Sequence, residues 1–251
     1  MPATPAWPPR SAPRLFVEQE LSFGAEVRIE GQQAHYLTKV MRLSEGQVVI
    51  LCDDATGEWS SIPAEIGKRH VVLEAMNRLR PRENVPDLWL CPALLKKDRF
   101  DLVLEKATEL GAARIQPVVT RRCVADKLNP ERARSIVVEA AEQCARTALP
   151  ELAEPVKLDA LLRDWPKERA LFFADELGGK PAAEAFAASA GPAAILIGPE
   201  GGFDDEERAV IRSHKQSRPI TLGPRILRGE TAAIAALATW MAVSGDWADE
   251  S

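Results

Sequence analysis

The spacing of apolar and polar residues changes character once along the chain. From Arg14 to Met76, short apolar runs alternate with turn-forming pairs such as Glu45-Gly46, a pattern typical of β-strands joined by tight turns. The runs cover residues 27–29, 48–51, 62–66 and 71–73. Leu37, Val40 and Met41 fall on one face of a predicted helix over residues 33–43. The pattern therefore predicts a small β-barrel interrupted by one helix.

Residues 77–86 carry two prolines and three arginines and are predicted to be a linker between two domains. Beyond them, apolar runs of strand length alternate with helical stretches. Strands are predicted over residues 88–94, 115–119, 170–174, 193–197 and 219–222, and helices over residues 97–110, 130–147, 158–165, 182–188, 204–214 and 228–243. This alternation predicts an α/β fold over residues 87–251, with a parallel sheet covered by helices on both faces.

The composition is that of a folded protein that needs no disulfide bonds. The 251 residues are 46% hydrophobic, enough for a sizeable core, whereas residues 1–13 are rich in proline and alanine and are predicted to be a disordered leader. The four cysteines lie far apart without a CxxC pair, so we expect reduced, buried thiols in a cytoplasmic protein. No signal peptide is recognisable, and no apolar run reaches the ~20 residues that span a bilayer.

Charge and motif content exclude several classes of function. Asp and Glu outnumber Lys and Arg by 37 to 32, so nucleic acid binding would need local basic patches. The sequence has no GxGxxG, GxxxxGK[ST], HExxH or GxSxG motif. The three histidines, His35, His70 and His214, fall on different predicted elements, so neither a metal site nor a histidine-based triad is expected.

Two glycine-containing loops are the candidates for ligand binding. The first, Ile195–Phe203, leaves a predicted strand as Gly-Pro-Glu-Gly-Gly and enters a helix that begins with four carboxylates, Asp204 to Glu207. Glycines let a ligand approach the backbone closely, whereas the carboxylates would repel a phosphate at this helix terminus. The loop therefore predicts a ligand without phosphates.

The second loop, Thr221–Ala232, follows the last predicted strand and also begins with Gly-Pro. Loops at the carboxyl ends of neighbouring parallel strands converge on one crevice, so the two loops are expected to form one pocket. Arg225, Arg228 and Glu230 would lie at its mouth, and Thr231 is available as a helix cap or hydrogen-bonding hydroxyl. Either loop alone is also explained as an ordinary Gly-Pro turn.

Together the two loops resemble the paired signatures of the ribosomal RNA small subunit methyltransferase E (RsmE) family, which belongs to the SPOUT class. The matching residues are Leu196–Gly202 and Leu222–Ala232, with weaker matches at His35–Arg42, Lys106–Gly111, Arg122-Cys123 and Glu142–Arg146. The resemblance implies S-adenosylmethionine as methyl donor and N3 of a uridine in 16S ribosomal RNA of the small subunit as acceptor. It also implies a PUA-like RNA-binding barrel over residues 14–76, a C-terminal trefoil knot and a homodimer.

The resemblance further implies a set of cofactor-binding residues in the loops after three strands. They are Ala174, Ile197, Gly198, Pro199, Glu200, Gly201, Gly202, Leu222, Gly223, Ile226 and Leu227. A sulfonium-bearing donor suits the acidic first loop. Between Arg228 and Glu230 the chain has Gly229, where the family usually carries threonine or alanine, and this glycine predicts a looser first helical turn.

Methyl transfer to N3 requires stabilisation of charge on the uracil oxygens and removal of a proton. Arg228, with Arg225, is the candidate for the first task. Glu230 is expected to accept the proton, to orient the arginine, or only to pair with an arginine at the helix start. The RNA backbone would be bound by Arg14, Lys39, Arg42, Arg121, Arg122 and Arg146, for each of which an ordinary surface charge is the alternative.

Two other functions fit parts of the sequence. A non-catalytic RNA-binding or ribosome assembly factor would keep the fold without the donor, but Gly198, Gly201, Gly202 and Gly223 argue against it. A small-molecule α/β enzyme would use the same crevice, but it would have no need of a separate β-rich domain. Methyl transfer to ribosomal RNA is therefore the preferred prediction.

Overall fold

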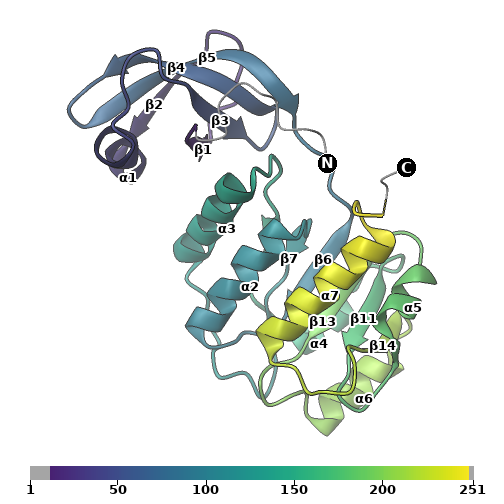
Figure 1. Cartoon of the computed structure of the whole chain (residues 1–251). Helices are drawn as coiled ribbons and strands as arrows, with labels where there is room; N and C mark the ends of the chain where they lie inside the picture. The colour runs from purple at the N-terminus through teal and green to yellow at the C-terminus, as the bar shows by residue number, and fades with distance from the viewer. Residues whose placement is uncertain (1–11, 249–251) are drawn as a thin grey trace. The chain divides into compact units, whose positions relative to one another are not determined.

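The computed structural model describes residues 12–248, so the leader predicted over residues 1–13 falls almost entirely outside the described part. The chain forms two units (Figure 1). Among the described residues, the first contains 12–84 together with 141–149, and the second contains 85–140 and 150–248.

The first unit is built on a five-stranded sheet with the order β1-β3-β4-β5-β2. Its strands are β1 (Arg14–Phe16), β2 (Glu26–Glu30), β3 (Val49–Asp53), β4 (Gly57–Ile66) and β5 (His70–Pro81). The pair β1–β3 is parallel and the other pairs are antiparallel. The alternation predicted in β2 is observed, because Val27 and Ile29 enter the core with Leu51, Val71 and Leu73 while the residues between them are exposed.

The helix predicted over residues 33–43 forms as a short α-helix, α1 (Gly31–His35), followed by a π-helical turn, η1 (Tyr36–Val40). Leu37 is fully buried as predicted, but Val40 and Met41 are exposed. The Met41 N–H donates to the Tyr36 carbonyl oxygen (2.9 Å), and this i→i+5 bond changes the angular spacing of the side chains. The apolar face predicted from α-helical spacing is therefore wrong for these two residues.

The second unit contains a seven-stranded sheet in which every pair of neighbouring strands is parallel. The strand order is β12-β14-β11-β13-β6-β7-β9. The strands are β6 (Leu88–Pro92), β7 (Arg114–Ile115), β9 (Glu151–Leu152), β11 (Ala170–Ala174), β12 (Lys180–Pro181), β13 (Ala193–Ile197) and β14 (Ser217–Thr221). This arrangement confirms the predicted α/β class and the parallel sheet.

Helices cover both faces of this sheet, as predicted. On one face, α2 (Lys97–Glu109) and α5 (Ala182–Ala187) pack against α7 (Gly229–Ser244), which lies on β6 and β13 (Figure 1). On the other face, α4 (Leu158–Arg163) and α6 (Asp205–Ser213) share a core with Leu171, Phe173 and Leu196. The central strands β11 and β13 are consequently almost fully buried.

The single strand predicted over residues 115–119 is two short strands in the structure. β7 ends at Ile115, and β8 (Val118–Val119) pairs instead with β10 (Val156–Lys157) in a separate two-stranded sheet. Gln116-Pro117 lies between them, and a proline has no N–H to continue the ladder. The predicted strand is therefore interrupted at its only proline.

The segment predicted as a linker also carries regular structure, because β5 continues through residues 77–81. Helix α3 (Pro130–Cys144) ends three residues before its predicted end, and the residue that follows it, Ala145, has a positive φ of 62°. Glu83 holds the chain after that helix within the first unit, since its Oε1 accepts the Thr147 N–H (2.7 Å) and the Ala148 N–H (3.1 Å).

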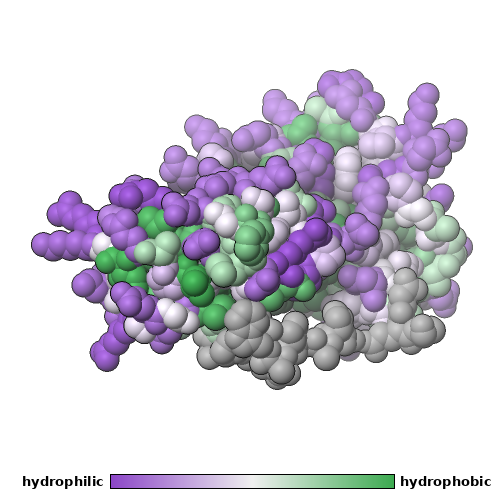
Figure 2. Space-filling view, turned by 90° about the horizontal axis from the view of Figure 1, so that it is seen from above, coloured by the Kyte–Doolittle hydropathy of each residue, from purple (hydrophilic) through white to green (hydrophobic). Residues whose placement is uncertain are grey.

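On the face shown in Figure 2, hydrophilic side chains surround smaller apolar areas. None of the helices within residues 12–248 is long and apolar enough to cross a membrane. The four cysteines, all of which lie within these residues, are free; Cys52 and Cys91 are buried, whereas Cys123 is half-buried and Cys144 is exposed. Burial raises the pKa of the Cys52 and Cys91 thiols to about 12, so these two thiols are unreactive near neutral pH.

Candidate functional site

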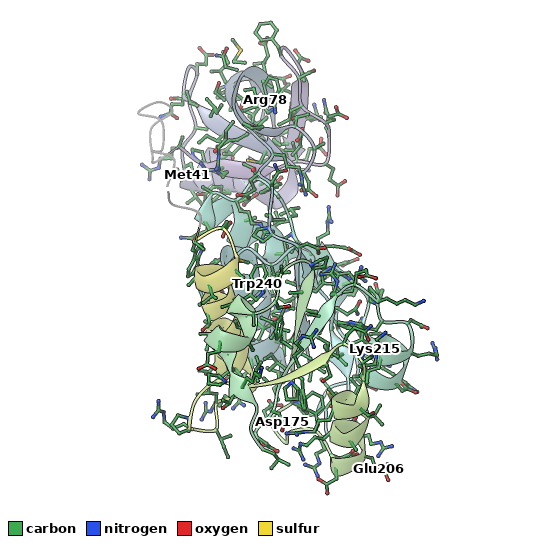
Figure 3. All side chains as sticks on the ribbon, turned by 90° about the vertical axis from the view of Figure 1, so that its right-hand side faces the viewer. Met41, Arg78, Asp175, Glu206, Lys215 and Trp240 are labelled. Atoms are coloured by element: carbon green, nitrogen blue, oxygen red, sulfur yellow. The ribbon has the colours of Figure 1, made fainter. Side chains whose placement is uncertain are left out.

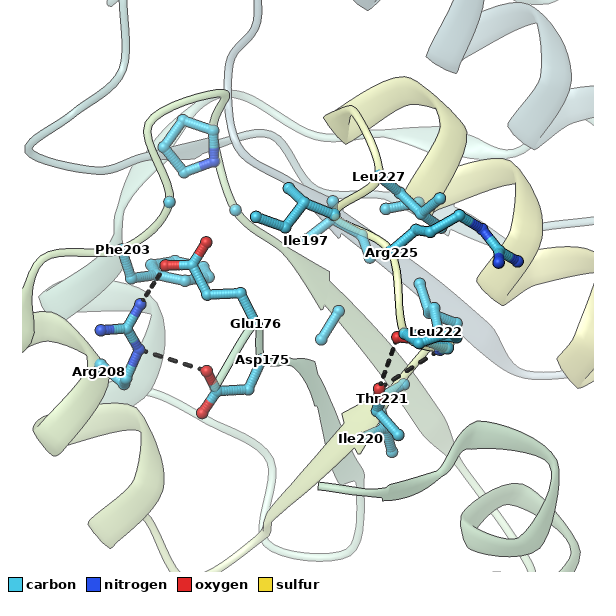
Figure 4. A pocket seen from close by; sticks show the side chains of 18 residues that line it. Asp175, Glu176, Ile197, Phe203, Arg208, Ile220, Thr221, Leu222, Arg225 and Leu227 are labelled. Carbon is cyan, nitrogen blue, oxygen red and sulfur yellow. Dashed lines mark hydrogen bonds and ion pairs between the residues drawn. The ribbon is translucent and has the colours of Figure 1, made fainter. Parts of the chain in front are cut away.

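A pocket lies at the carboxyl ends of three adjacent strands, β13, β11 and β14 (Figure 4). Figure 3 shows Asp175 and Glu206 at this end of the second unit, with Trp240 of α7 farther from it. The two glycine-containing loops predicted to meet both line the pocket, together with the segment that follows β11. The lining residues are Ala174–Glu176, Ile197–Pro199, Gly202, Phe203, Arg208, Ile220–Leu227 and Ala232.

The first loop turns tightly because the Gly202 N–H donates to the Pro199 carbonyl oxygen (2.9 Å). Gly202 has a φ of 66°, a conformation that residues with a Cβ rarely adopt. A Cβ on Gly198 would lie 2.9 Å from the Phe203 ring, and one on Gly202 would lie 2.8 Å from Glu176 Oε1. These two glycines therefore set the shape of this wall.

The second loop is held by Thr221, whose Oγ1 accepts the Gly223 N–H and donates to the Gly223 carbonyl oxygen (both 3.3 Å). Gly223 has a φ of 109°. Leu222 and Leu227 give the loop half-buried apolar side chains, whereas Ile226 is 88% exposed at the pocket rim. The loop thus offers backbone groups and apolar surface to a ligand.

The segment after β11 and helix α6 form a third part of the lining with charged side chains. The resemblance implies a donor-binding loop at Phe173-Ala174-Asp175, but sequence analysis missed Glu176 and Arg208. Arg208 donates to Glu176 Oε1 (2.6 Å), and its Nε lies 3.3 Å from Asp175 Oδ1 (Figure 4). Arg212, one helical turn later, donates from Nε to Asp175 Oδ2 (2.7 Å). Two features of the sequence could have indicated these ion pairs: arginines spaced i, i+4 on a predicted helix, and an Asp-Glu pair directly after a predicted strand.

Helix α6 begins with a capping box that fixes the end of the first loop. The Asp204 side chain accepts the Glu207 N–H (2.7 Å), and the Glu207 side chain accepts the Asp204 N–H (3.2 Å). The bond from the Glu207 backbone lowers the pKa of Asp204, which Arg121 lowers further. Arg122 donates to the Gly201 carbonyl oxygen (2.9 Å), so two arginines bind this loop and the helix start.

The structure brings nine of the eleven predicted cofactor-binding residues to the pocket lining. The two outside the lining, Glu200 and Gly201, belong to the same turn. Among the predicted catalytic residues, Arg225 lines the pocket and Arg228 and Glu230 do not. In Figure 4 the Arg225 guanidinium lies on the opposite side of the pocket from the Arg208–Glu176 pair.

Arg228 and Glu230 lie on either side of Gly229, at the start of α7. The Arg228 side chain is exposed and has no hydrogen bond or ion pair within residues 12–248, whereas Glu230 is buried. The ion-pair partner of Glu230 is Arg99 of α2. A Cβ on Gly229 would lie 3.0 Å from Leu95 Cδ2 and 3.3 Å from the Gly198 carbonyl oxygen. Gly229 thus lets Leu95 and the Gly198 carbonyl oxygen pack closely against the start of α7. This close packing accounts for the glycine without the looser helical turn predicted from its low helix propensity.

The six basic residues predicted to bind RNA fall into three environments. Lys39 and Arg42 are exposed, without a side-chain partner among the described residues. Arg121 and Arg122 bind the carboxylates and carbonyl groups around the start of α6. Arg14 donates to Glu58, and Arg146 is only 5% exposed. The Arg14 guanidinium is half-buried and paired with Glu58, and Arg146 is buried, so these two residues offer less charge to a phosphate than Lys39 and Arg42 do.

Within residues 12–248 there is no group of three or more His, Cys, Asp or Glu side chains that could hold a metal ion. The three histidines belong to different elements, as predicted: His35 ends α1, His70 begins β5 and pairs with Glu65, and His214 follows α6.

Comparison with known proteins identifies both units. A family model described as an RNA methyltransferase domain matches residues 81–241, and one described as an RNA methyltransferase PUA domain matches residues 29–76. The ribosomal RNA small subunit methyltransferase E of Synechocystis is 33% identical, with 90% of this chain and 76% of the relative covered. The protein of the same name from Rickettsia conorii is 29% identical, with 90% of this chain and 93% of the relative covered.

Two solved structures resemble the chain over nearly its whole length. A Neisseria gonorrhoeae ribosomal RNA small subunit methyltransferase E bound to S-adenosyl methionine has a TM-score of 0.85 and 26% identity, covering 94% of this chain and 99% of its own. A Legionella pneumophila methyltransferase in complex with its cofactor SAM has a TM-score of 0.83 and 30% identity, with the same coverage.

Proposed function

Since the chain belongs to the ribosomal RNA small subunit methyltransferase E family, we propose that it methylates N3 of a uridine in 16S ribosomal RNA, with S-adenosylmethionine as methyl donor. The observation that carries the proposal is the meeting of the two glycine loops in one pocket at the carboxyl ends of β13, β11 and β14. A pocket there is the position expected for the ligand of an open parallel sheet.

The pocket residues fit this donor better than they fit a nucleotide phosphate. Ile197, Leu222 and Leu227 offer apolar surface for an adenine ring, and the Gly198 and Gly202 backbone permits close approach. The Arg208 guanidinium is already bound by Asp175 and Glu176, so it is not free for a phosphate. Glu176 adds a carboxylate that suits a ribose hydroxyl or a cation.

Bound S-adenosylmethionine supplies an electrophilic methyl group on a sulfonium. The chain's own tasks are then to hold the uracil, to stabilise negative charge on its ring oxygens and to accept the N3 proton. Arg225 and Arg228 have side chains without partners in the described structure, which leaves both guanidinium groups available for the ring oxygens. Glu230 is the carboxylate nearest in sequence to these arginines and is our candidate for the proton acceptor.

Arg228→Ala tests this assignment. We expect methylation to fall by about 100-fold, because a charge-stabilising group in the transition state is removed. The affinity for S-adenosylmethionine, measured by calorimetric titration, should stay within about threefold of the unmodified protein. The matched variant Gly202→Val should do the reverse and abolish donor binding, because a β-branched residue is strained at a φ of 66° and the loop that lines the pocket must rearrange. Normal turnover by Arg228→Ala would remove Arg228 from the mechanism.

The target itself is tested by mapping methylated uridines in 16S ribosomal RNA from a strain without the gene, with and without the gene restored. A uridine that regains N3 methylation only on restoration is the expected result. If calorimetry shows no binding of S-adenosylmethionine, the protein would instead be a binding factor that has kept the fold. We place the reaction in the cytoplasm with the ribosomal subunits.

We also infer that the second unit contains the trefoil knot, that the first unit closes as a PUA-like barrel, and that the active form is a homodimer. The knot and barrel are supported by the likeness to the Neisseria gonorrhoeae structure and by the match to the PUA family model. The homodimer rests on family membership alone, and sedimentation velocity of the purified protein tests it.

A further inference from the structure

Three segments that lie far apart in the sequence meet at the side chain of Arg99. This residue is in the first turn of α2. Its Nη1 donates to Glu200 Oε1 in the first glycine loop (3.4 Å), and its Nε lies 3.8 Å from Glu230 Oε1 at the start of α7. One guanidinium therefore links a loop beside the pocket to the carboxylate that we propose as proton acceptor.

Glu230 depends on this contact more than an exposed carboxylate would. Its side chain is only 11% exposed, and its Oε2 is buried without a hydrogen-bond partner in the described structure. A buried carboxylate is costly to leave uncompensated, and Arg99 is the only cation within residues 12–248 that pairs with it. Oε2 is therefore the Glu230 oxygen that Arg99 does not compensate, and it is enclosed by protein in this arrangement.

The start of α2 also touches the start of α7 through an apolar contact. Leu95, four residues before Arg99, lies so close to Gly229 that a Cβ there would be 3.0 Å from Leu95 Cδ2. The backbone at Gly229 and the side chain at Glu230 are thus both fixed from the same side. A carboxylate held by its neighbours in this way reacts from one defined position.

We propose that Arg99 is a positioning residue that holds Glu230 and the Glu200 end of the glycine loop in the arrangement needed for methyl transfer, and that it acts on the reaction through Glu230. The proposal rests on the proposed function. Arg99 does not line the pocket, so it has no contact with the donor in this arrangement. Its effect should consequently appear in turnover more than in donor affinity.

A double-mutant cycle with Arg99→Ala and Glu230→Gln tests the proposal. We expect each single substitution to lower kcat by about tenfold or more, with the KM for the RNA substrate changed by less than about twofold. In the Glu230→Gln background, adding Arg99→Ala should lower kcat by less than about a further twofold. Arg99→Lys keeps a cation and should recover most of the lost turnover.

Lys97→Ala is the matched control, because Lys97 is an exposed cation in the same turn of α2 without a partner in the described structure. Its kcat and thermal unfolding temperature should equal those of the unmodified protein. Equal losses from Arg99→Ala in the unmodified and the Glu230→Gln backgrounds would overturn the proposal, as would unchanged kcat in either single variant. If Arg99→Ala unfolds the protein, the Arg99→Lys variant decides the question. A folded Arg99→Lys variant that has lost all turnover would contradict the proposal that the positive charge at this position holds Glu230.

Failure of this inference is distinguishable from failure of the proposed function. A protein that binds S-adenosylmethionine and methylates RNA, yet shows additive losses in the cycle, would keep its function and lose the role of Arg99. An unmodified protein that transfers no methyl group to ribosomal RNA would remove both.

Discussion

The buried Asp53 carboxylate holds three segments of the first unit together through hydrogen bonds. The residue is 2% exposed, and its oxygens accept hydrogen bonds from the N–H groups of Leu21 (2.6 Å), Gly57 (3.0 Å) and Thr56 and from Thr56 Oγ1 (2.7 Å). Burial alone would raise its pKa, but these hydrogen bonds outweigh burial and hold the pKa below the ordinary 3.8. The ionised carboxylate ties the segment after β1 to the end of β3 and to the turn into β4.

The lowered pKa predicts a pH dependence of stability. The folded state holds the Asp53 proton less tightly than the unfolded chain does. The ionised carboxylate therefore adds its full contribution to the free energy of unfolding above pH 3.8, and this contribution is lost as the pH falls through the lower pKa of the folded state. Asp53→Asn should lower the free energy of unfolding by about 1–3 kcal/mol at neutral pH and remove this dependence. Urea unfolding at several pH values measures both effects.

Glu45→Gln, a change at an exposed carboxylate of the same unit, is the control and should alter the stability little. An unchanged stability of Asp53→Asn near neutral pH would contradict the account.

The structural role of Gly229 could not be predicted from the sequence. Helix propensity predicted only a looser turn, because propensity describes a helix in isolation. The reason for the glycine is a close approach of Leu95 and the Gly198 carbonyl oxygen, residues far away in the sequence. The partner of Glu230 was missed for the same reason, since Arg99 belongs to a different helix.

At the scale of elements, periodicity located the long strands and helices, and local chemistry decided where they end. Pro117 divides a predicted strand, and a π-helical turn rotates Val40 and Met41 out of the predicted face. Helix α3 ends just before Ala145, whose positive φ allows the Arg146 N–H to donate to the Ala141 carbonyl oxygen (3.0 Å). An alanine in this conformation carries strain that a glycine would not.

Ala145→Gly should therefore stabilise the protein. We expect a gain of about 0.5–1 kcal/mol in the free energy of unfolding, because the strain relieved exceeds the extra backbone entropy of glycine. The same substitution inside α3, Ala133→Gly, should cost about 1 kcal/mol or more, since it is buried and helical. Urea midpoints of the two variants give the comparison, and a loss of stability in both would show that the positive φ is unstrained.

For the whole molecule, net charge opposes RNA binding, so binding must depend on a few cations. Lys39 and Arg42 are the predicted RNA contacts that remain exposed and unpaired within the described chain. We expect methylation of the subunit to weaken as salt rises, with Lys39→Ala and Arg42→Ala each reducing the slope of log affinity against log salt by about 1. Exposed Lys68→Ala is the control, and a slope that no substitution changes would exclude these two residues.

Sequence reasoning identified the pocket at this scale because both loops follow strands, and parallel strands end at the same edge. It placed Asp175 in a donor-binding loop but did not foresee its pairing with Arg208 and Arg212, because each of these arginines resembles a solvated surface charge when considered alone. It also proposed Arg14 and Arg146 as RNA contacts, because the sequence does not show that Arg14 pairs with Glu58 or that Arg146 is buried.

The position of β11 between β13 and β14 has a consequence for the opening motions of the sheet. β11 hydrogen-bonds to both neighbours, and each of the three strands contributes a loop to the same pocket. A ligand held between those loops must leave before the strands can separate, so its binding free energy adds to the cost of their opening. Backbone amides in all three strands would then exchange with deuterium more slowly, and in concert, when the pocket is filled.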